Sequence, residues 1–157
     1  MTVKIRLARE TDVADIVKML ADDPLGTTRE KHQLPLSEDY ITAFDAIESD
    51  PNNELVVATI EDKLVAVLQL TFIPYLTYQG GWRALIEGVR VAADHRSQGI
   101  GRQMFEWAIE RARKRNCHMV QLTTDRSRPE ALGFYEKLGF VSSHYGLKLK
   151  FGDNPLQ

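Results

Sequence analysis

A short glycine-containing loop is the segment of this chain whose residues are best suited to chemistry. Residues 96–102 read Arg-Ser-Gln-Gly-Ile-Gly-Arg and lie between a predicted strand and a predicted helix. Gly99 and Gly101 have no Cβ atom, so the backbone there can approach a ligand closely. The free N–H groups of a first helical turn point outward at the positive end of the helix dipole, where an anion gains roughly 0.3–1 kcal/mol. With Arg96 and Arg102 beside it, the loop predicts a phosphate-binding site; the alternative is a helix start without a ligand.

Two widespread phosphate-binding patterns do not fit this loop. The dinucleotide-binding fingerprint requires a third glycine where Met104 stands, and it usually follows the first strand of a domain. The P-loop requires Gly-Lys followed by Ser or Thr, which is absent here. The loop therefore belongs to neither class.

Hydrophobic periodicity predicts the elements that position this loop. Alternating apolar residues are typical of strands, and repeats at i, i+3, i+4 and i+7 are typical of helices. Strands are expected over Val3–Ala8, Glu54–Ile60, Leu64–Ile73, Arg83–Val91, His118–Thr124 and Phe140–Phe151. Helices are expected over Val13–Leu20, Ser37–Asp50, Gly99–Arg115 and Pro129–Leu138. N-caps are offered by Thr11, Asp12 and Ser37. Leu25–Pro35 is expected as a loop and Pro74–Trp82 as a turn.

This order of elements predicts one α/β domain over residues 1–157. We expect a central, mostly antiparallel mixed sheet flanked by about four helices. The helix over Gly99–Arg115 joins two strands as a crossover, so those strands are expected to be parallel.

Composition and charge exclude several classes of protein. The 157 residues include 20 Lys plus Arg and 22 Asp plus Glu, so the net charge is −2. With 43% hydrophobic and 27% charged residues the chain resembles a soluble globular domain rather than a disordered one. The charge gives no support to a nucleic-acid partner. No apolar run approaches the ~18 residues that a membrane helix needs. Charged residues also occur within the first ten positions, where a signal peptide would need its apolar stretch. We therefore expect a cytoplasmic protein without a membrane partner.

The cysteine and the histidines do not point to further chemistry. A single cysteine, Cys117, excludes an internal disulfide and a cysteine-rich zinc module. The four histidines show no metal-ligand spacing, so we expect no metal cofactor.

Two sequence blocks resemble the GNAT superfamily of acyl-CoA-dependent N-acetyltransferases. Residues 96–101 fit that family's Arg/Gln-x-x-Gly-x-Gly/Ala signature, and they follow a predicted strand as the signature does. Residues 128–140, which end in Phe-Tyr-Glu-Lys-Leu-Gly-Phe, are similar to the family's closing helix and strand. Both blocks occur in the family's order and spacing, and the predicted elements match its fold over nearly the whole chain.

The resemblance implies that acetyl-CoA enters a gap between two parallel strands that splay apart, here Arg83–Val91 and His118–Thr124. The pyrophosphate would lie on backbone N–H groups, and the pantetheine arm would pair with the first of these strands. Gly88 lies inside the otherwise regular predicted strand Arg83–Val91, and a glycine there independently indicates a β-bulge or a close approach of another group to the backbone. The residues expected to bind acetyl-CoA are Val89, Val91, Arg96, Gln98, Gly99, Ile100, Gly101, Arg102 and Arg128.

Two residues are expected to move protons. An amine must lose a proton before it attacks a thioester, and Glu87 is the only carboxylate in the strand beside the gap. Burial would raise the pKa of such a glutamate toward the range in which a carboxylate is useful as a base. The alternative is an exposed strand residue or an ion-pair partner. The resemblance places Tyr135 beside the CoA sulfur, where its protonated phenol can donate a proton to the departing thiolate. The alternative is that the Tyr135 ring only packs the closing helix against the sheet.

One position departs from the family pattern. Many relatives carry an asparagine seven residues before this tyrosine, where it contacts pantetheine, but here the residue is Arg128. An arginine can hydrogen-bond carbonyls or a phosphate, so we retain it among the CoA-binding residues.

Acceptor recognition is expected to come from the segments outside these blocks. Arg29, Tyr75, Trp82 and His144 are the candidates, although each can also serve a surface or packing role. The pattern Gly-Phe…Ser-His over residues 139–144 is similar to aminoalkylphosphonate and amino-sugar acetyltransferases.

The sequence thus predicts an N-acetyltransferase that moves acetyl from acetyl-CoA to the primary amine of a small metabolite by direct attack. Two alternatives remain: an acetyltransferase that modifies a protein lysine or N-terminus, and a non-catalytic acyl-CoA-binding module. Apolar residues in the Pro74–Trp82 turn favour a homodimer.

Overall fold

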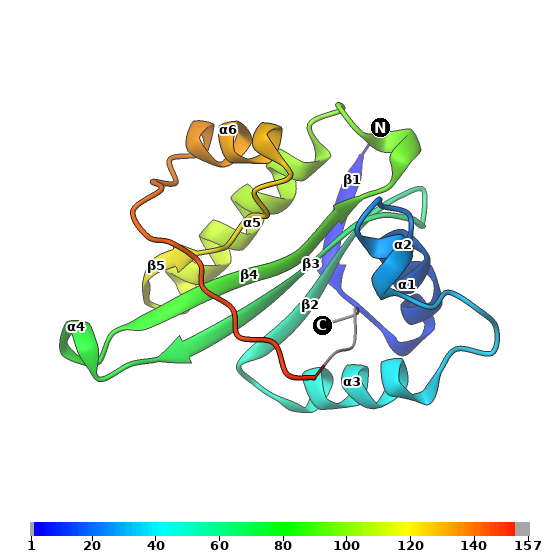
Figure 1. The fold of residues 1–157 in the computed structure, drawn as a ribbon, viewed down its shortest axis with the longest axis horizontal. Coiled ribbons are helices and arrows are strands. Elements are labelled where there is room, and N and C mark those ends of the chain that lie inside the picture. The colour runs from blue at the N-terminus through cyan, green and yellow to red at the C-terminus, as the bar shows by residue number, and fades with distance from the viewer. Residues whose placement is uncertain (1, 153–157) are drawn as a thin grey trace.

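A mixed sheet carries the predicted loop at the end of its fourth strand (Figure 1). The computed structural model describes residues 2–152, and within them the sheet order is β1-β2-β3-β4-β5. The strands are β1 (Val3–Leu7), β2 (Asn53–Ile60), β3 (Lys63–Pro74), β4 (Trp82–Val91) and β5 (Cys117–Gln121). Neighbours from β1 to β4 are antiparallel, whereas β4 and β5 are parallel. The predicted mixed sheet with one parallel pair is therefore confirmed.

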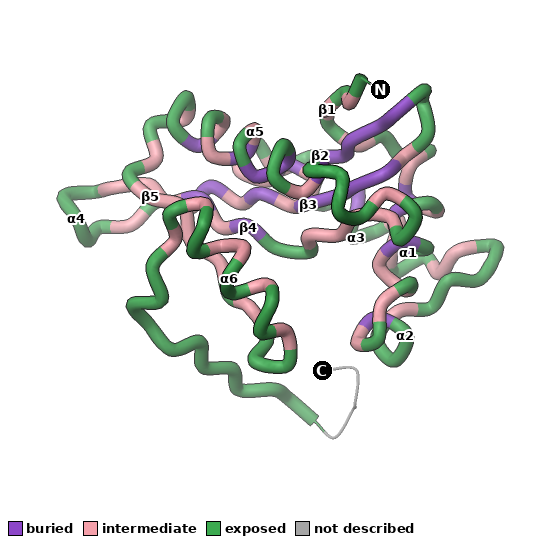
Figure 2. The backbone as a smooth tube through the Cα atoms, turned by 90° about the horizontal axis from the view of Figure 1, so that it is seen from above, coloured by how far each residue is buried: buried purple, intermediate pink, exposed green. Residues whose placement is uncertain are grey.

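Helices lie on both sides of this sheet, with α5 on one side and α1 on the other (Figure 2). The helices are α1 (Val13–Ala21), α2 (Gly26–Arg29), α3 (Glu38–Ser49), α4 (Thr77–Gly80), α5 (Ile100–Lys114) and α6 (Pro129–Lys137). Short 3-10 turns precede α1 and α5, over Glu10–Asp12 and Ala93–His95. The four long helices match the expected ones in place. The one-turn helices α2 and α4 lie in segments expected as a loop and a turn.

Alternation along β3 explains why both faces of the sheet are covered. Leu68, Leu70 and Phe72 point to one face and pack against α5, where Met104 and Phe105 are buried. Val67 points to the other face and packs with Ile16 and Met19 of α1. A strand that is apolar on both faces needs a layer on each side, and the amphipathic helices supply these layers.

Of the expected N-caps, Ser37 makes a capping hydrogen bond and Asp12 does not. Ser37 caps α3 as expected, because its Oγ accepts a hydrogen bond of 3.3 Å from the Asp39 N–H. Asp12 precedes α1 but makes no capping hydrogen bond to that helix. Its carboxylate instead accepts hydrogen bonds of 2.7 Å from Arg6 Nη1 and from the Arg9 N–H, so it closes the 3-10 turn.

The strand expected over Phe140–Phe151 is the clearest error of the sequence prediction. The structure assigns no strand after α6 within the described residues; Phe140 is half-buried, and residues 141–151 are exposed. A strand requires a neighbour to pair with, and in this single chain the segment has none. The strand expected over His118–Thr124 is also shorter, since it ends at Gln121.

The parallel pair opens partway along β4. Its last paired residues are Leu85 and Gln121, although β4 continues to Val91. The register of β4 on β3 shifts between Val67 and Gln69, opposite Gly88, whose φ is +63°. The bulge that Gly88 indicated is therefore present, and beyond it β4 pairs with β3 alone among the described strands.

An ion pair with one buried partner ties the start of β2 to α5. Glu54 is buried, and its carboxylate accepts hydrogen bonds of 2.8 Å and 2.7 Å from Nε and Nη2 of Arg111. The bond to Glu54 raises the pKa of Arg111 further above its ordinary value.

We predict that Arg111→Ala lowers the free energy of unfolding by about 3 kcal/mol, because it leaves the Glu54 carboxylate buried without its partner. Urea unfolding of the two proteins measures this loss. The matched control is Arg113→Ala on the same helix, where an exposed pair with Glu110 at 3.7 Å is worth at most about 1 kcal/mol. Equal losses in the two variants would contradict the assignment.

Candidate functional site

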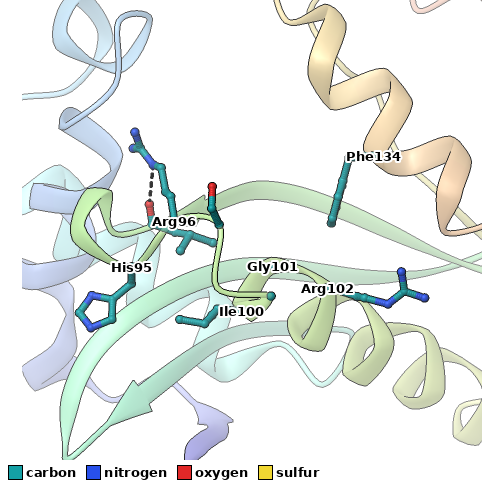
Figure 3. A pocket seen from close by; sticks show the side chains of 9 residues that line it. His95, Arg96, Ile100, Gly101, Arg102 and Phe134 are labelled. Carbon is teal, nitrogen blue, oxygen red and sulfur yellow. Dashed lines mark hydrogen bonds between the residues drawn. The ribbon is translucent and has the colours of Figure 1, made fainter. Parts of the chain in front are cut away.

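The predicted phosphate-binding loop lines a cavity of about 310 Å³ at the start of α5 (Figure 3). The cavity is lined by Val91, His95, Arg96, Ser97, Gly99, Ile100, Gly101, Arg102 and Phe134. The end of β4, the connecting loop, the first turn of α5 and the middle of α6 thus meet here. Of the predicted loop residues, Gln98 is not part of the lining, and its side-chain Nε2 lies 3.5 Å from the Asp94 carbonyl oxygen.

Backbone conformation explains one of the two glycines. Gly99 precedes α5 with a φ of +79°, a left-handed conformation that side chains with a Cβ rarely adopt. Nothing lies within 4 Å of where its Cβ would be, so space does not impose the glycine. At Gly101 a Cβ would meet Phe134 and Val91 at an ordinary 3.8 Å. Only Gly99 is therefore required by the fold of the loop.

The two loop arginines are held by different partners. Arg96 Nε donates to the Val91 carbonyl at 3.2 Å, the dashed contact of Figure 3, and its Nη2 lies 3.4 Å from the Asp22 carbonyl. Arg102 is exposed, and its Nε donates to Glu106 at 2.8 Å. Arg96 therefore joins the loop to β4 and to the end of α1, whereas the charge of Arg102 is balanced along α5.

His95 is a lining residue that the sequence analysis did not select. Its side chain is largely buried, and Nδ1 lies 2.9 Å from Oδ1 of Asp94. This hydrogen bond lowers the pKa of Asp94 below its ordinary value. Its position directly before Arg96, between a strand and a helix start, was the available signal.

Both valines expected to pair with pantetheine, Val89 and Val91, lie on the part of β4 beyond its last pair with β5. The Val89 carbonyl accepts a 2.7 Å hydrogen bond from Arg90 Nη1, and the Val91 carbonyl accepts one from Arg96. A carbonyl oxygen has two lone pairs, so each retains capacity for a second donor.

Tyr135 packs within an aromatic cluster between α5 and α6. Its ring centroid lies 5.3 Å from that of Phe105 and 5.6 Å from that of Phe134, both in edge-to-face geometry. Burial raises the pKa of the Tyr135 phenol, and the positive charges of Arg128 and Arg90 offset this only in part. The phenol therefore carries its proton at neutral pH, as a general acid requires. Tyr135 thus packs between the two helices, and its phenol is also protonated at neutral pH, which a general acid requires.

Asp23 joins three elements beside this tyrosine. Its Oδ2 accepts hydrogen bonds of 2.6 Å from Arg128 Nη2, 3.3 Å from Arg90 Nη2 and 3.2 Å from the Gly26 N–H. Burial alone would raise the pKa of Asp23, but the Arg128 hydrogen bond and the charges of both arginines outweigh it and lower that pKa. Arg128, expected to contact CoA, is thus held by an acidic residue of the α1–α2 connection. Neither Asp23 nor Arg90 was selected from the sequence.

Glu87 is exposed, so the burial expected for it is not found. It precedes the bulge at Gly88 and lies opposite Gln69 of β3. The buried neighbours Ala84 and Ile86 point to the α5 side of the sheet, which leaves Glu87 on the other face. Its role as a base stays a prediction.

The four residues expected to contact the acceptor do not come together. Tyr75 and Trp82 flank α4, at the opposite end of β4 from the cavity (Figure 1). Arg29 ends α2, and His144 is exposed after α6. Trp82 packs in part against the core. The structure therefore groups six of the nine CoA-binding candidates around one cavity but leaves out Val89, Gln98 and Arg128, and it does not group the acceptor-binding candidates.

Comparisons with known proteins agree with this geometry. The sequence profile of the Acetyltransferase (GNAT) family matches residues 15–140, so the chain belongs to this family. It is 29% identical to the aminoalkylphosphonate N-acetyltransferase of Salmonella typhimurium over 65% of this chain and 66% of that protein. It is 28% identical to the thialysine N-epsilon-acetyltransferase of Mus musculus over 88% of this chain and 84% of that one.

A solved structure matches the fold over almost the whole chain. This crystal structure, described as a transcriptional regulator from Bacillus halodurans C-125, is 57% identical with a TM-score of 0.94. The match covers 96% of this chain and 100% of that one.

Two kinds of feature are absent from residues 2–152. No helix there is long and apolar enough to cross a membrane. That part of the chain also contains no group of three or more His, Cys, Asp or Glu side chains placed to hold a metal ion.

We predict that Gly99→Ala lowers the free energy of unfolding by about 1–2 kcal/mol, because alanine is strained at a φ of +79°. The same variant should bind CoA more weakly, since relief of the strain moves the loop N–H groups. Gly133→Ala, in α6, where a Cβ has open space and φ is not left-handed, is the matched control: it should lower neither stability nor CoA affinity. Urea unfolding and calorimetric titration with CoA measure both, and equal behaviour of the two variants would contradict the loop assignment.

Proposed function

We propose that this chain transfers the acetyl group of acetyl-CoA to the primary amine of a small metabolite. The observation that carries the proposal is the cavity at Gly99, which lies at the Val91 end of β4, on the stretch of that strand that no longer pairs with β5. A cofactor-sized thioester needs both features: N–H groups for its phosphates and an opening for its acyl end. The residues around the cavity are compatible with this ligand, since Arg96 and His95 add polar contacts to the backbone groups.

The reaction requires two proton transfers. The amine attacks the thioester carbonyl, a C–N bond forms, the C–S bond breaks, and the electron pair leaves on sulfur. Tyr135 is proposed to donate its phenolic proton to that sulfur, which its raised pKa permits. Glu87 is proposed to accept the proton of the amine, directly or through water; its exposure supports a route through water.

The named relatives favour a small amine as acceptor. The Salmonella and mouse proteins are named for aminoalkylphosphonate and thialysine, and both of these compounds are small amines. Transfer to a protein lysine or N-terminus, and acyl-CoA binding without catalysis, are the alternatives to this proposal.

Gene regulation is a second candidate, favoured by the description of the 57% identical Bacillus halodurans protein. A chain of net charge −2 offers little electrostatic attraction for DNA, whose binding depends on phosphate neutralisation. Fluorescence anisotropy with random duplex DNA at low salt tests this candidate, and tight, salt-dependent binding would support it.

Thiol release from acetyl-CoA across a panel of amines tests the proposed reaction. The panel contains polyamines, amino sugars, amino acids, aminoalkylphosphonates and short peptides. We expect release with one class of small amine. Release with peptides only would favour the protein substrate, and CoA binding without any release would favour the binding module.

We predict that Tyr135→Phe lowers turnover by at least about 10²-fold while CoA affinity stays unchanged, because the phenol only donates a proton during the reaction. With its raised pKa, the phenol of the wild-type enzyme should remain a competent acid throughout the neutral range, and deprotonation should slow turnover only at a pH above the ordinary pKa of a tyrosine. Tyr78→Phe, at the exposed α4, is the control and should behave as wild type. A parallel loss of CoA affinity in Tyr135→Phe would instead assign Tyr135 to packing alone.

A further inference from the structure

The bulge at Gly88 brings Arg90 to the same face of the sheet as Glu87. Glu87 lies opposite Gln69 of β3. Three residues later Arg90 lies opposite Val67, which is only two residues away along β3. Without the extra residue, side chains three positions apart on a strand would point to opposite faces. Because Val67 packs with α1, Arg90 and Glu87 both lie on the α1 side of the sheet.

Arg90 is a largely buried guanidinium with an incomplete set of partners. Its side chain is 18% exposed. Nη1 donates to the Val89 carbonyl at 2.7 Å, and Nη2 lies 3.3 Å from Oδ2 of Asp23, whereas the buried Nε has no hydrogen-bond partner among the described residues. Burial lowers the pKa of Arg90, and the charges of Arg128 and Arg29 lower it further. The charge of Asp23 offsets only part of this effect, so a further anion at this place would stabilise the charged form.

Two more arginines lie around the same carboxylate. Arg128 donates from Nη2 to Oδ2 of Asp23 at 2.6 Å, and its side chain is 30% exposed, so a ligand can reach it. Arg29 is exposed at the end of α2, near enough for its charge to act on Arg90. One carboxylate therefore serves two guanidinium groups, and a third cation lies beside them.

The other carboxylates near these arginines are engaged by other donors. Oε1 of Glu30 accepts a hydrogen bond of 2.9 Å from the Tyr40 hydroxyl. Oδ1 of Asp125 accepts hydrogen bonds from the N–H and the Oγ of Ser127, at 2.9 Å and 2.8 Å. Among the described residues only Asp23 forms an ion pair with this group of arginines. Guanidinium donors therefore remain for a second oxyanion.

We infer that the acceptor is a small amine that also carries an oxyanion group, a phosphonate, phosphate or carboxylate, and that Arg90 and Arg128 bind this group. The inference rests on the proposed function and names the class of its acceptor. A guanidinium fork matches the oxygens of such a group and can bind two of them at once. Glu87, on the same face of β4, would then attract the ammonium end. A carboxylate and a guanidinium on one face suit the two charges of a zwitterion.

The position of Tyr135 connects this subsite to the proposed reaction. The charges of Arg128 and Arg90 both act on the Tyr135 phenol, so the arginines lie near the proposed general acid. An oxyanion held by them would therefore leave the amine of the same small molecule close to the reacting groups. A neutral amine would lack this anchor, and a diamine would bring a second cation to a positively charged site.

Initial rates of thiol release with matched amines test the acceptor class on the wild-type protein. Aminoethylphosphonate, phosphoethanolamine and β-alanine carry an oxyanion; propylamine and ethanolamine do not, and putrescine carries a second cation. We expect kcat/KM to be at least about tenfold higher for the best oxyanion amine than for the neutral amines, because charge-assisted hydrogen bonds are the stronger kind. Putrescine should be the poorest substrate. The rank of the three oxyanion amines then identifies the group that the arginines bind.

The outcomes separate this inference from the proposed function. Neutral amines that react as well as the oxyanion amines would overturn the inference and leave the proposed acetyl transfer standing. Thiol release with no amine, in this set or in the wider panel, would overturn the proposed reaction and the inference with it.

Substitution of the arginines tests the subsite itself. Arg90→Gln and Arg128→Gln should each raise the KM of the best oxyanion amine at least about tenfold, with little change in the KM of acetyl-CoA. Arg90→Lys keeps the charge but not the planar fork, so it should recover part of the loss. Arg113→Gln, exposed on α5, is the matched control and should leave both KM values unchanged. Because Arg90 is largely buried, Arg128→Gln serves as the test if Arg90→Gln does not fold.

A purely structural role, or a role in CoA binding, would give a different pattern. A KM that rises for acetyl-CoA but not for the amine would assign the arginines to CoA. An equal loss of kcat/KM with neutral and oxyanion amines would assign them to the fold. Either result would overturn the inference.

Discussion

The loss of pairing between β4 and β5 beyond Leu85 and Gln121 is the constraint on which the site depends. Two parallel strands that stayed paired would fill the space where a ligand is proposed to enter. Past the bulge at Gly88, β4 still pairs with β3 but not with β5, so the strand keeps its hydrogen bonds on one side and has no paired neighbour on the other among the described strands. The cavity at the start of α5 lies at the open end of this pair.

Aromatic packing joins α5 to α6 and to the residue that follows it. Phe105 of α5 contacts Phe134, Tyr135 and Phe140 in edge-to-face geometry, so α5 and α6 are joined beside the gap rather than through a strand. The proposed general acid is a member of this cluster. Its ring fixes its position by packing, and its burial keeps the phenol protonated. One side chain thus serves the stability of the fold and meets a requirement of the proposed chemistry.

Asp23 connects the two halves of the chain around the same region. It holds Arg90 of β4 and Arg128 at the start of α6, which are far apart in the sequence, and it belongs to the connection between α1 and α2. Because its pKa is lowered, its ionised form stabilises the fold at and above neutral pH. That contribution is fully present above the pKa of an unfolded aspartate and is lost as the pH falls through the lowered value. The α1–α2 connection is therefore fixed to the helix that carries the proposed general acid, Tyr135.

Local pattern in the sequence determined the long elements, the loop at Gly99 and the parallel pair, because alternation, helical periodicity and glycine spacing are properties of neighbouring residues. The bulge at Gly88 was also indicated, since a glycine inside a strand has few other reasons to occur there. Only the tertiary structure revealed the Asp23 cluster, the exposure of Glu87 and the separation of Tyr75 from Arg29, because each depends on contacts between distant segments. Residues 141–151 show the limit most clearly: their pattern is that of a strand, but a strand forms only where a neighbour supplies hydrogen bonds, and the single chain supplies none.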